Sequence, residues 1–306
     1  MPDEIPGAEP RPCPAPDSNP HGPTRFEVPK AAVDTHSHII GLPPRYPFMA
    51  TRSYTPPEAP LEKYLAMLDA TGMAFGGLTQ VSVHGSDNRL LIEALKAEPK
   101  RLRGVAVAPP DAPERELVML KDAGVVALRL NVLYGGGIGF DALDRYGALC
   151  RDMEWHLQLL VDARRLPELA SKLSRLPVEF LVDHMGHMPA SEGVHNSGFR
   201  TLVSLLRDGA WVRLSGAYRT SVQGPPYADT IAFARALHET APDRCLWGSD
   251  WPHVANWGKM PNVGDLLDLL ADWVPDEPAR HKVLVENPRR LYCFSESLPS
   301  PGPVLG

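Results

Sequence analysis

The feature that most constrains the fold of this chain is the alternation of short apolar runs with amphipathic helical patterns through residues 30–294. Eight runs have the length and apolar content of buried strands. They are predicted at 31–36, 76–83, 103–108, 125–130, 155–162, 178–183, 211–215 and 244–249. Strands that alternate with helices predict a parallel sheet with right-handed crossovers.

Helical patterns fill the intervals between these runs. They are predicted near 60–71, 87–98, 113–122, 139–152, 166–175, 198–207, 227–239 and 263–272. In the first of them, Leu61, Tyr64, Leu65 and Leu68 have the spacing of one buried helical stripe. Eight βα units at this length favour a single-domain (β/α)8 barrel, which usually spans about 250 residues. A doubly wound open sheet is the alternative, but no GxGxxG follows the first strand.

Both ends of the chain lack this periodicity. Residues 1–29 are rich in proline, and residues 295–306 have a similar composition. Such segments bury too little apolar surface to offset the entropy of ordering. We therefore expect a flexible N-terminal arm at 1–29, a barrel at 30–294 and a flexible C-terminal tail at 295–306.

The composition narrows the class of protein. A hydrophobic content of 43% and a charged content of 22% are typical of a globular protein. The net charge of -6 gives no electrostatic case for nucleic acid or anionic membranes. No apolar run is long enough to span a membrane, and the start of the chain lacks the pattern of a signal peptide. The four scattered cysteines suggest a reducing compartment, so we expect a cytoplasmic protein, with a homo-oligomer possible.

The candidate functional residues lie at the ends of the predicted strands, where the active site of a barrel enzyme is found. They are His36, His38, Ser82, His84, Asp87, Asn88, Arg129, Asn131, His156, Gln158, Asp162, Asp183, His184, His187, Ser215, Tyr218, Arg219, Ser249, Asp250 and His253. His36 and His38 face the same side of an extended strand, because side chains alternate along it. Such a pair can hold a metal ion or polarise an oxygen, although alone it is also typical of an exposed surface.

Several of these residues also have a structural explanation. Asp34 is expected to support the first turn and orient the histidines rather than to react. His156, beside Trp155, is expected to be a core histidine, and His84 and His253 can lie behind the site. Arg129 suits either a buried ion pair or the binding of a substrate carboxylate, which an arginine can grip with two hydrogen bonds.

Two common catalytic arrangements are excluded. The glycine run Gly135–Gly137 is expected to be a flexible loop, because no Lys-Ser/Thr follows it as in a phosphate-binding loop. The chain has no GxSxG, so a serine-nucleophile hydrolase is not indicated.

Seven segments together resemble the amidohydrolase superfamily, and within it the branch of 2-pyrone-4,6-dicarboxylate lactonase and related lactone hydrolases. They are VDTHSHI (33–39), QVSVHGSDN (80–88), LRLN (128–131), VDHMGH (182–187), LSGAYRTS (214–221), WGSDWPH (247–253) and ENPRRLY (286–292). They occur in order through nearly all of 30–294. The resemblance implies a distorted (β/α)8 barrel and attack of water on the ester of a lactone.

The resemblance also implies residue roles. His36, His38 and His184 would surround and polarise the lactone carbonyl. Asp250 would act as general base for the water and then pass the proton to the leaving oxygen. The remaining site residues would position substrate carboxylates and ring oxygens: Ser82, His84, Arg129, Tyr218 and Arg219.

The chain departs from the branch at the expected substrate contacts. The second arginine that follows Arg129 in the pyrone dicarboxylate enzymes is replaced within Leu133-Tyr134-Gly135, and a tyrosine is replaced near Gln158. A lactone with one acidic group, from aromatic or sugar-acid breakdown, is therefore as consistent with the sequence as the pyrone dicarboxylate.

The resemblance leaves the metal question open. The fourth predicted strand has no lysine that could bridge two metals. One zinc or manganese ion on His36, His38, His184 and Asp250 remains consistent with the sequence. So does a reaction without metal.

Two other functions compete with the lactone hydrolase. One is a metal-dependent decarboxylase of the same superfamily, which also joins strand-end histidines to an aspartate and an arginine. The other is a barrel without catalytic activity, since a fold does not determine a function. The presence of Asp250 with all three histidines argues against this second alternative.

Overall fold

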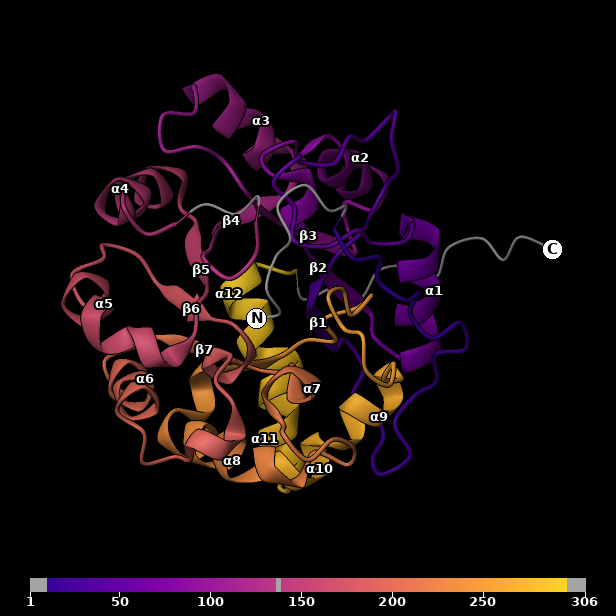
Figure 1. Ribbon diagram of the computed structural model, residues 1–306, viewed down its shortest axis with the longest axis vertical. Helices are drawn as coiled ribbons and strands as arrows, with labels where there is room; N and C mark the ends of the chain where they lie inside the picture. The colour runs from indigo at the N-terminus through magenta and orange to yellow at the C-terminus, as the bar shows by residue number, and fades with distance from the viewer. Residues whose placement is uncertain (1–9, 136–138, 296–306) are drawn as a thin grey trace.

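The computed structural model describes residues 10–135 and 139–295 and shows a ring of eight parallel strands surrounded by helices (Figure 1). The strands are β1 (Val33–Ser37), β2 (Phe75–Thr79), β3 (Leu102–Ala106), β4 (Val125–Asn131), β5 (His156–Leu160), β6 (Phe180–Val182), β7 (Trp211–Leu214) and β8 (Cys245–Trp247). They pair in chain order. A parallel bridge between Ser37 and Trp251 joins the two ends of the sheet. The predicted single-domain (β/α)8 barrel is confirmed.

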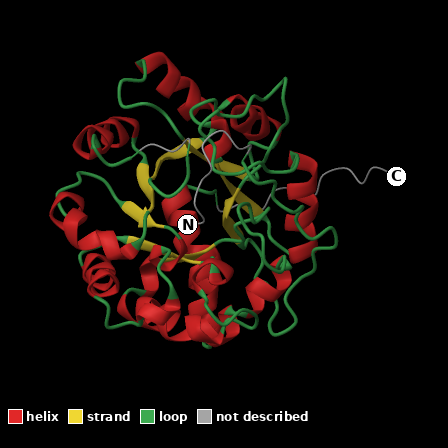
Figure 2. Cartoon of the chain, in the orientation of Figure 1, coloured by secondary structure: helices red, strands yellow, loops and turns green. Residues whose placement is uncertain are grey.

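Helices accompany the strands, and most of them lie outside the strand ring in Figure 2. They are α1 (Leu61–Thr71), α2 (Arg89–Ala97), α3 (Glu114–Ala123), α4 (Leu143–Met153), α5 (Leu166–Leu173), α6 (Ser197–Arg207), α7 (Ala217–Thr220), α8 (Ile231–Thr240), α9 (Val263–Asp268), α10 (Leu270–Trp273), α11 (Glu277–His281) and α12 (Asn287–Tyr292). Each predicted helix has a counterpart, and the last one is divided into α9 and α10. In α1 the expected stripe is present: Tyr64 and Leu68 are buried, and Leu61 and Leu65 are half-buried. Among the described residues, no helix is long and apolar enough to cross a membrane.

Three short helices were not predicted. They are α7, which follows β7 directly, and α11 and α12, which are joined by a π-helical turn at Lys282–Glu286. Both α11 and α12 carry a proline in their first turn, where proline is tolerated because that N–H needs no helical partner. With 5 and 6 residues, these helices are too short to show the apolar period by which a helix is recognised in a sequence.

The part of the N-terminal arm that the structure describes lies along the barrel. The backbone N–H of Cys13 donates to the carbonyl of Thr55 at 2.8 Å, and the indole of Trp257 donates to the carbonyl of Pro12 at 2.9 Å. These contacts place residues 12 and 13 between the loop that follows β1 and the loop that follows β8. Residues 1–9, 296–306 and 136–138, which include most of the predicted tail and of the glycine-rich loop, lie outside the described residues. The flexibility of the arm and of the tail stays a prediction.

Helix α12 closes the end of the barrel at which the strands begin. Figure 1 shows α12 near the middle of the strand ring. The side-chain amide of Asn287 donates to the carbonyls of Pro242 and Cys245, both at 2.9 Å. At the other end of the helix, the Tyr292 hydroxyl donates to the carbonyl of Thr35 at 2.9 Å. The last helix is therefore tied to the first and last strands.

The Asn287→Ala variant should unfold more easily than the unchanged protein, by about 1–3 kcal/mol in the free energy of unfolding. The substitution leaves two carbonyls at the base of the barrel without their donor, one of them buried beside β8. Urea denaturation measures the difference. Glu286→Gln, at the exposed neighbouring position, is the control and should change the stability little. Equal stability of the two variants would contradict this role for Asn287.

Candidate active site

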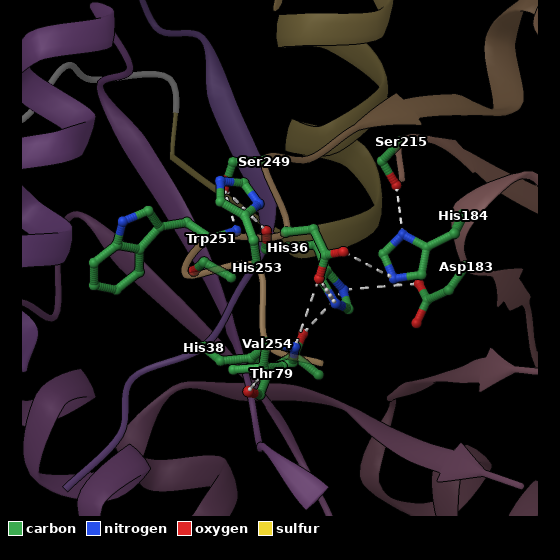
Figure 3. A network of polar contacts seen from close by, with 12 residues as sticks. His36, His38, Thr79, Asp183, His184, Ser215, Ser249, Trp251, His253 and Val254 are labelled. Carbon is green, nitrogen blue, oxygen red and sulfur yellow. Dashed lines mark hydrogen bonds and ion pairs between the residues drawn. The ribbon is translucent and has the colours of Figure 1, made fainter. Parts of the chain in front are cut away.

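Three imidazoles and one carboxylate meet at the end of the barrel where the strands finish. His36 Nε2 lies 3.6 Å from Asp250 Oδ1, and His38 Nε2 lies 3.9 Å from the same oxygen. His184 Nε2 lies 3.7 Å from the other oxygen, Oδ2. All four side chains are buried. The structure thus brings together the four residues predicted to be catalytic. Figure 3 shows the three histidines among them.

The first and last strands hold this cluster in position. Asp34 accepts hydrogen bonds from the backbone N–H of Ser249 at 2.8 Å and from its hydroxyl at 2.7 Å. The backbone N–H of Asp250 in turn donates to the carbonyl of His36 at 2.8 Å. Gly248 permits the close approach, since a Cβ there would lie 2.8 Å from Cβ of His36. These contacts support the expectation that Asp34 orients the site.

The backbone of the catalytic loops is strained. Asp250 has a φ of 60° and His184 a φ of 50°, in the left-handed region that side chains other than glycine rarely adopt. Such conformations persist only where surrounding contacts impose them, and they are frequent at active sites. Here the tether between Asp34 and Ser249 supplies such contacts beside Asp250.

The two oxygens of Asp250 have different surroundings. Oδ2 accepts hydrogen bonds from the Tyr218 hydroxyl at 2.6 Å and from Arg219 Nε at 2.5 Å. Oδ1 is buried and has no hydrogen-bond partner, although it faces His36 and His38. A lone pair on Oδ1 is therefore free for a water molecule or another ligand.

The site keeps its carboxylate charged and its imidazoles neutral. Burial favours the neutral acid, but the charge of Arg219 and its hydrogen bond hold the pKa of Asp250 well below its usual range. Burial lowers the pKa of His38 to about 3, aided by the charge of Arg129. Burial also holds the pKa values of His36 and His184 well below the usual range. The site therefore combines one anionic base with neutral imidazoles.

A second polar network lies beneath the cluster, and its central residue was not predicted from the sequence. Arg213, on β7, is completely buried and forms an ion pair with Asp183, which follows β6. The Gln158 amide donates to Asp183 Oδ2 at 3.1 Å, and the Tyr292 hydroxyl accepts from Arg213 at 2.7 Å. The signal for Arg213 was available, because it is the charged residue in the apolar run WVRLS.

The predicted substrate arginines differ in their free hydrogen-bond donors. Arg219 donates to Asp250, to the Tyr134 hydroxyl and to the carbonyl of Val254. Arg129 is buried and its Nε has no partner, while its Nη1 donates to the carbonyl of Gln80 at 3.5 Å and its Nη2 lies 3.7 Å from Asp183 Oδ2. Arg129 thus has one donor without a partner and otherwise long contacts, and a substrate role stays a prediction for both arginines.

The other predicted residues lie around the cluster. The Ser82 hydroxyl is 3.0 Å from the Tyr54 hydroxyl, a residue that the sequence analysis did not identify. His84 contacts the carbonyl of Pro47 through Nδ1 at 3.2 Å. His156 is buried and its ring packs against Tyr292, 5.2 Å away, in agreement with a core histidine. His253 Nδ1 lies 3.3 Å from the Tyr218 hydroxyl, behind Asp250.

The positions of the cluster residues fit one divalent metal ion. One ligand atom each from His36, His184 and Asp250 lies within 4.8 Å of the others. His36 Nε2 and Asp250 Oδ1 are buried without hydrogen-bond partners. A set of nitrogen and carboxylate donors suits zinc. In the described part of β4 no lysine is present to bridge a second metal.

The ring of His38 should remain neutral from pH 8 down to pH 5, because burial and Arg129 lower its pKa to about 3. Its C–H resonances should therefore not move over this range in an NMR titration of the full-length protein. A His38→Gln variant assigns the signals. A midpoint near the usual histidine pKa of about 6.5 would contradict the proposed electrostatics of the site.

Comparison with known proteins agrees with this architecture. The family model described as Amidohydrolase matches residues 33–294. The 4-sulfomuconolactone hydrolase of Rhizobium radiobacter is 38% identical over 287 residues, with 92% of this chain and 96% of the relative covered. The 2-pyrone-4,6-dicarboxylate hydrolase of Comamonas testosteroni is 35% identical over 292 residues, with 91% and 95% covered.

A solved structure has the same fold. It is that of a candidate 2-pyrone-4,6-dicarboxylic acid hydrolase from Acinetobacter baumannii with citric acid bound. It is 26% identical to this chain and superposes with a TM-score of 0.77, covering 86% of this chain and 100% of that one. The match of the family model over almost the whole barrel and the two relatives lead to one conclusion: the chain belongs to the amidohydrolase family.

Proposed function

We propose that the protein is a lactonase, which opens the ring of a small acidic lactone by attack of water on the ester carbonyl. The observation that carries the proposal is the free oxygen of Asp250. Oδ1 is buried, has no hydrogen-bond partner and faces His36 and His38, whereas Oδ2 is fixed by Tyr218 and Arg219. Relatives that are 35% and 38% identical are named as lactone hydrolases, which supports this reaction class.

Asp250 Oδ1 is the proposed general base. It takes a proton from water as the water oxygen bonds to the lactone carbonyl carbon. The carbonyl oxygen becomes an oxyanion, which the imidazoles of His36, His38 and His184 surround. When the ring C–O bond breaks, the departing ring oxygen takes the proton from Asp250. The product is the ring-opened acid with one water added, and the carboxylate is regenerated.

Electrostatics supports this use of Asp250. A carboxylate whose pKa is held low is a weak base, but it is ionised at all physiological pH values. Because the proton is returned to the leaving oxygen, the carboxylate needs to hold it only briefly. Tyr218 and Arg219 both bind Oδ2 and orient the carboxylate, so that Oδ1 points toward the imidazoles.

Arg129 is the proposed anchor for a substrate carboxylate. It is buried with its Nε unpaired, and a buried guanidinium with free donors is stabilised by a carboxylate that binds two of them. Ser82, Tyr54 and His84 lie on the β1 and β2 loops and are proposed to contact the rest of the ring. A second arginine is absent at Leu133-Tyr134-Gly135, so we propose a substrate with one carboxylate.

A divalent metal ion, zinc or manganese, remains part of the proposal as an alternative to a metal-free site. The ligands would come from His36, His38, His184 and Asp250, and the ion would supply Lewis-acid polarisation of the carbonyl and of the water.

A metal-dependent decarboxylase is the alternative reaction. Cytoplasmic location and assembly as a homo-oligomer stay predictions.

Asp250→Asn should lower kcat for lactone hydrolysis by about 10²–10⁴-fold, because the amide cannot take the proton from water. The measurement is ring opening of a panel of carboxylated lactones, with metal analysis of the purified protein. Asp87→Asn, outside the cluster, is the control. Turnover of Asp250→Asn near that of the unchanged protein would remove Asp250 from the mechanism. Release of CO2 from a carboxylated substrate, with no lactone opened, would favour the decarboxylase.

The protein should prefer a 2-pyrone with one carboxylate over the matching 2-pyrone-4,6-dicarboxylate when kcat/KM is compared. A second buried carboxylate would lack a guanidinium partner and would lose solvation. In addition, Arg129→Met should raise KM for the monocarboxylate by at least tenfold, because the substrate anion loses its partner. Preference for the dicarboxylate would contradict the single anchor but leave the lactonase proposal intact.

A further inference from the structure

His38 presents a lone pair to the site. Its Nδ1 lies 2.7 Å from the carbonyl oxygen of Thr79. A carbonyl oxygen only accepts hydrogen bonds, so Nδ1 of this neutral ring must carry the proton. Its Nε2 therefore has a lone pair, 3.9 Å from Asp250 Oδ1.

His36 has the opposite surroundings. Its Nδ1 lies 3.0 Å from a guanidinium nitrogen of Arg213 and 3.0 Å from the amide nitrogen of Gln158, and the Thr79 hydroxyl, which can donate to it, is farther away at 3.4 Å. A guanidinium has no acceptor, so Nδ1 of His36 must accept. Asp183 Oδ1 is 3.8 Å from this nitrogen, which is too far for it to receive a hydrogen bond from it.

The orientation of the Gln158 amide is fixed by its other contacts. Its nitrogen also donates to Asp183 Oδ2 at 3.1 Å, and its oxygen lies 3.4 Å from the Tyr292 hydroxyl. In the reversed orientation the amide oxygen would face the Asp183 carboxylate, and two acceptors would oppose each other. Gln158 is therefore a second donor to His36, and the neutral ring carries its proton on Nε2.

We propose that Arg213 and Gln158 fix His36 as an Nε2–H donor, so that the two histidines of the motif have opposite roles. His36 donates a hydrogen bond to the carbonyl oxygen that reacts, and His38 accepts one from the attacking water. His36 Nε2 is buried, has no partner and lies 3.6 Å from Asp250 Oδ1, which leaves the N–H directed into the reacting space. Arg213 and Gln158 act through His36 and are positioning residues. The identity of the oxygen as that of a lactone rests on the proposed function.

This arrangement also decides which residues suit a metal ion. A metal needs the lone pair of a ring nitrogen, and on His36 Nε2 the proton occupies that place. Moving the proton to Nδ1 would direct an N–H at the guanidinium of Arg213. The donors around Nδ1 therefore weigh against His36 as a metal ligand, although its Nε2 lies closer to Asp250 than that of His38 and belongs with His184 and Asp250 to the cluster described above.

The tautomers can be observed directly in the unchanged full-length protein with ¹⁵N-labelled histidine. Long-range ¹H–¹⁵N correlation spectra distinguish a protonated ring nitrogen from an unprotonated one, and the His36→Gln and His38→Gln variants assign the signals. We expect His36 to be protonated at Nε2 and His38 at Nδ1. Protonation of His36 at Nδ1, or the same tautomer in both rings, would overturn the proposal.

A pair of matched variants tests the effect on the reaction. Gln158→Met removes one donor to His36 without leaving a charge unpaired, because Asp183 keeps Arg213. Tyr292→Phe removes a hydroxyl from the same network but no donor to His36. We expect Gln158→Met to lower kcat about tenfold with little change in KM, and Tyr292→Phe to lower it less than twofold. Equal losses of kcat in the two variants would mean that Gln158 only supports the structure, and this would contradict its role in fixing the tautomer of His36.

Zinc addition gives an independent readout. The Nε2–H signal of His36 should persist with excess zinc sulfate, whether or not the signals of His38 and His184 shift. Loss of that signal, with His36 becoming protonated at Nδ1, would show that the metal binds His36 and would contradict the proposal. If the protein opens no lactone, the lactonase proposal fails. The ¹H–¹⁵N spectra then still decide whether His36 carries its proton on Nε2.

Discussion

The buried ion pair between Arg213 and Asp183 is the interaction on which the site depends. Both side chains have no exposed surface. Burying two charges costs solvation, so such a pair is retained only where further hydrogen bonds satisfy it, and removing one partner typically costs about 3–5 kcal/mol. Here those hydrogen bonds come from Thr35, Gln158 and Tyr292. Three strands and the last helix thus meet at one charge pair beneath the catalytic cluster.

This polar layer replaces part of the apolar packing that usually fills the inside of a barrel. The benefit of this layer is that it fixes the direction of the hydrogen bonds of His36. Apolar side chains would leave the imidazole of His36 free to take either tautomer, whereas a guanidinium and an amide at 3.0 Å select one. The same layer brings positive charge near the histidines, which helps to keep them neutral. A single structural feature therefore sets both the charge and the hydrogen-bonding direction of the site.

The barrel and the catalytic cluster were predictable from sequence for a physical reason. Strands buried on both faces form continuous apolar runs, and polar residues that interrupt their ends are noticeable. His36, His184 and Asp250 were found in this way, and the structure brings them together. Arg213 and Tyr292 were not found as site residues, because their contacts with Thr35 and Asp183 join segments far apart in the chain. The hydrogen-bond partners of Arg219 and Arg129 also depend on the fold. The sequence therefore could not show that the donors of Arg219 are occupied whereas Nε of Arg129 has no partner.

The position of α12 determines the order in which parts of the site become available while the chain is synthesised. Asn287 and Tyr292 follow all eight strands in the chain, yet they contact the start of β8 and the carbonyl of Thr35 in β1. The strands are therefore synthesised before the hydroxyl that binds Arg213. Until α12 is made, Arg213 lacks this partner. A nascent barrel thus has the catalytic side chains before it has all of the support that orients them.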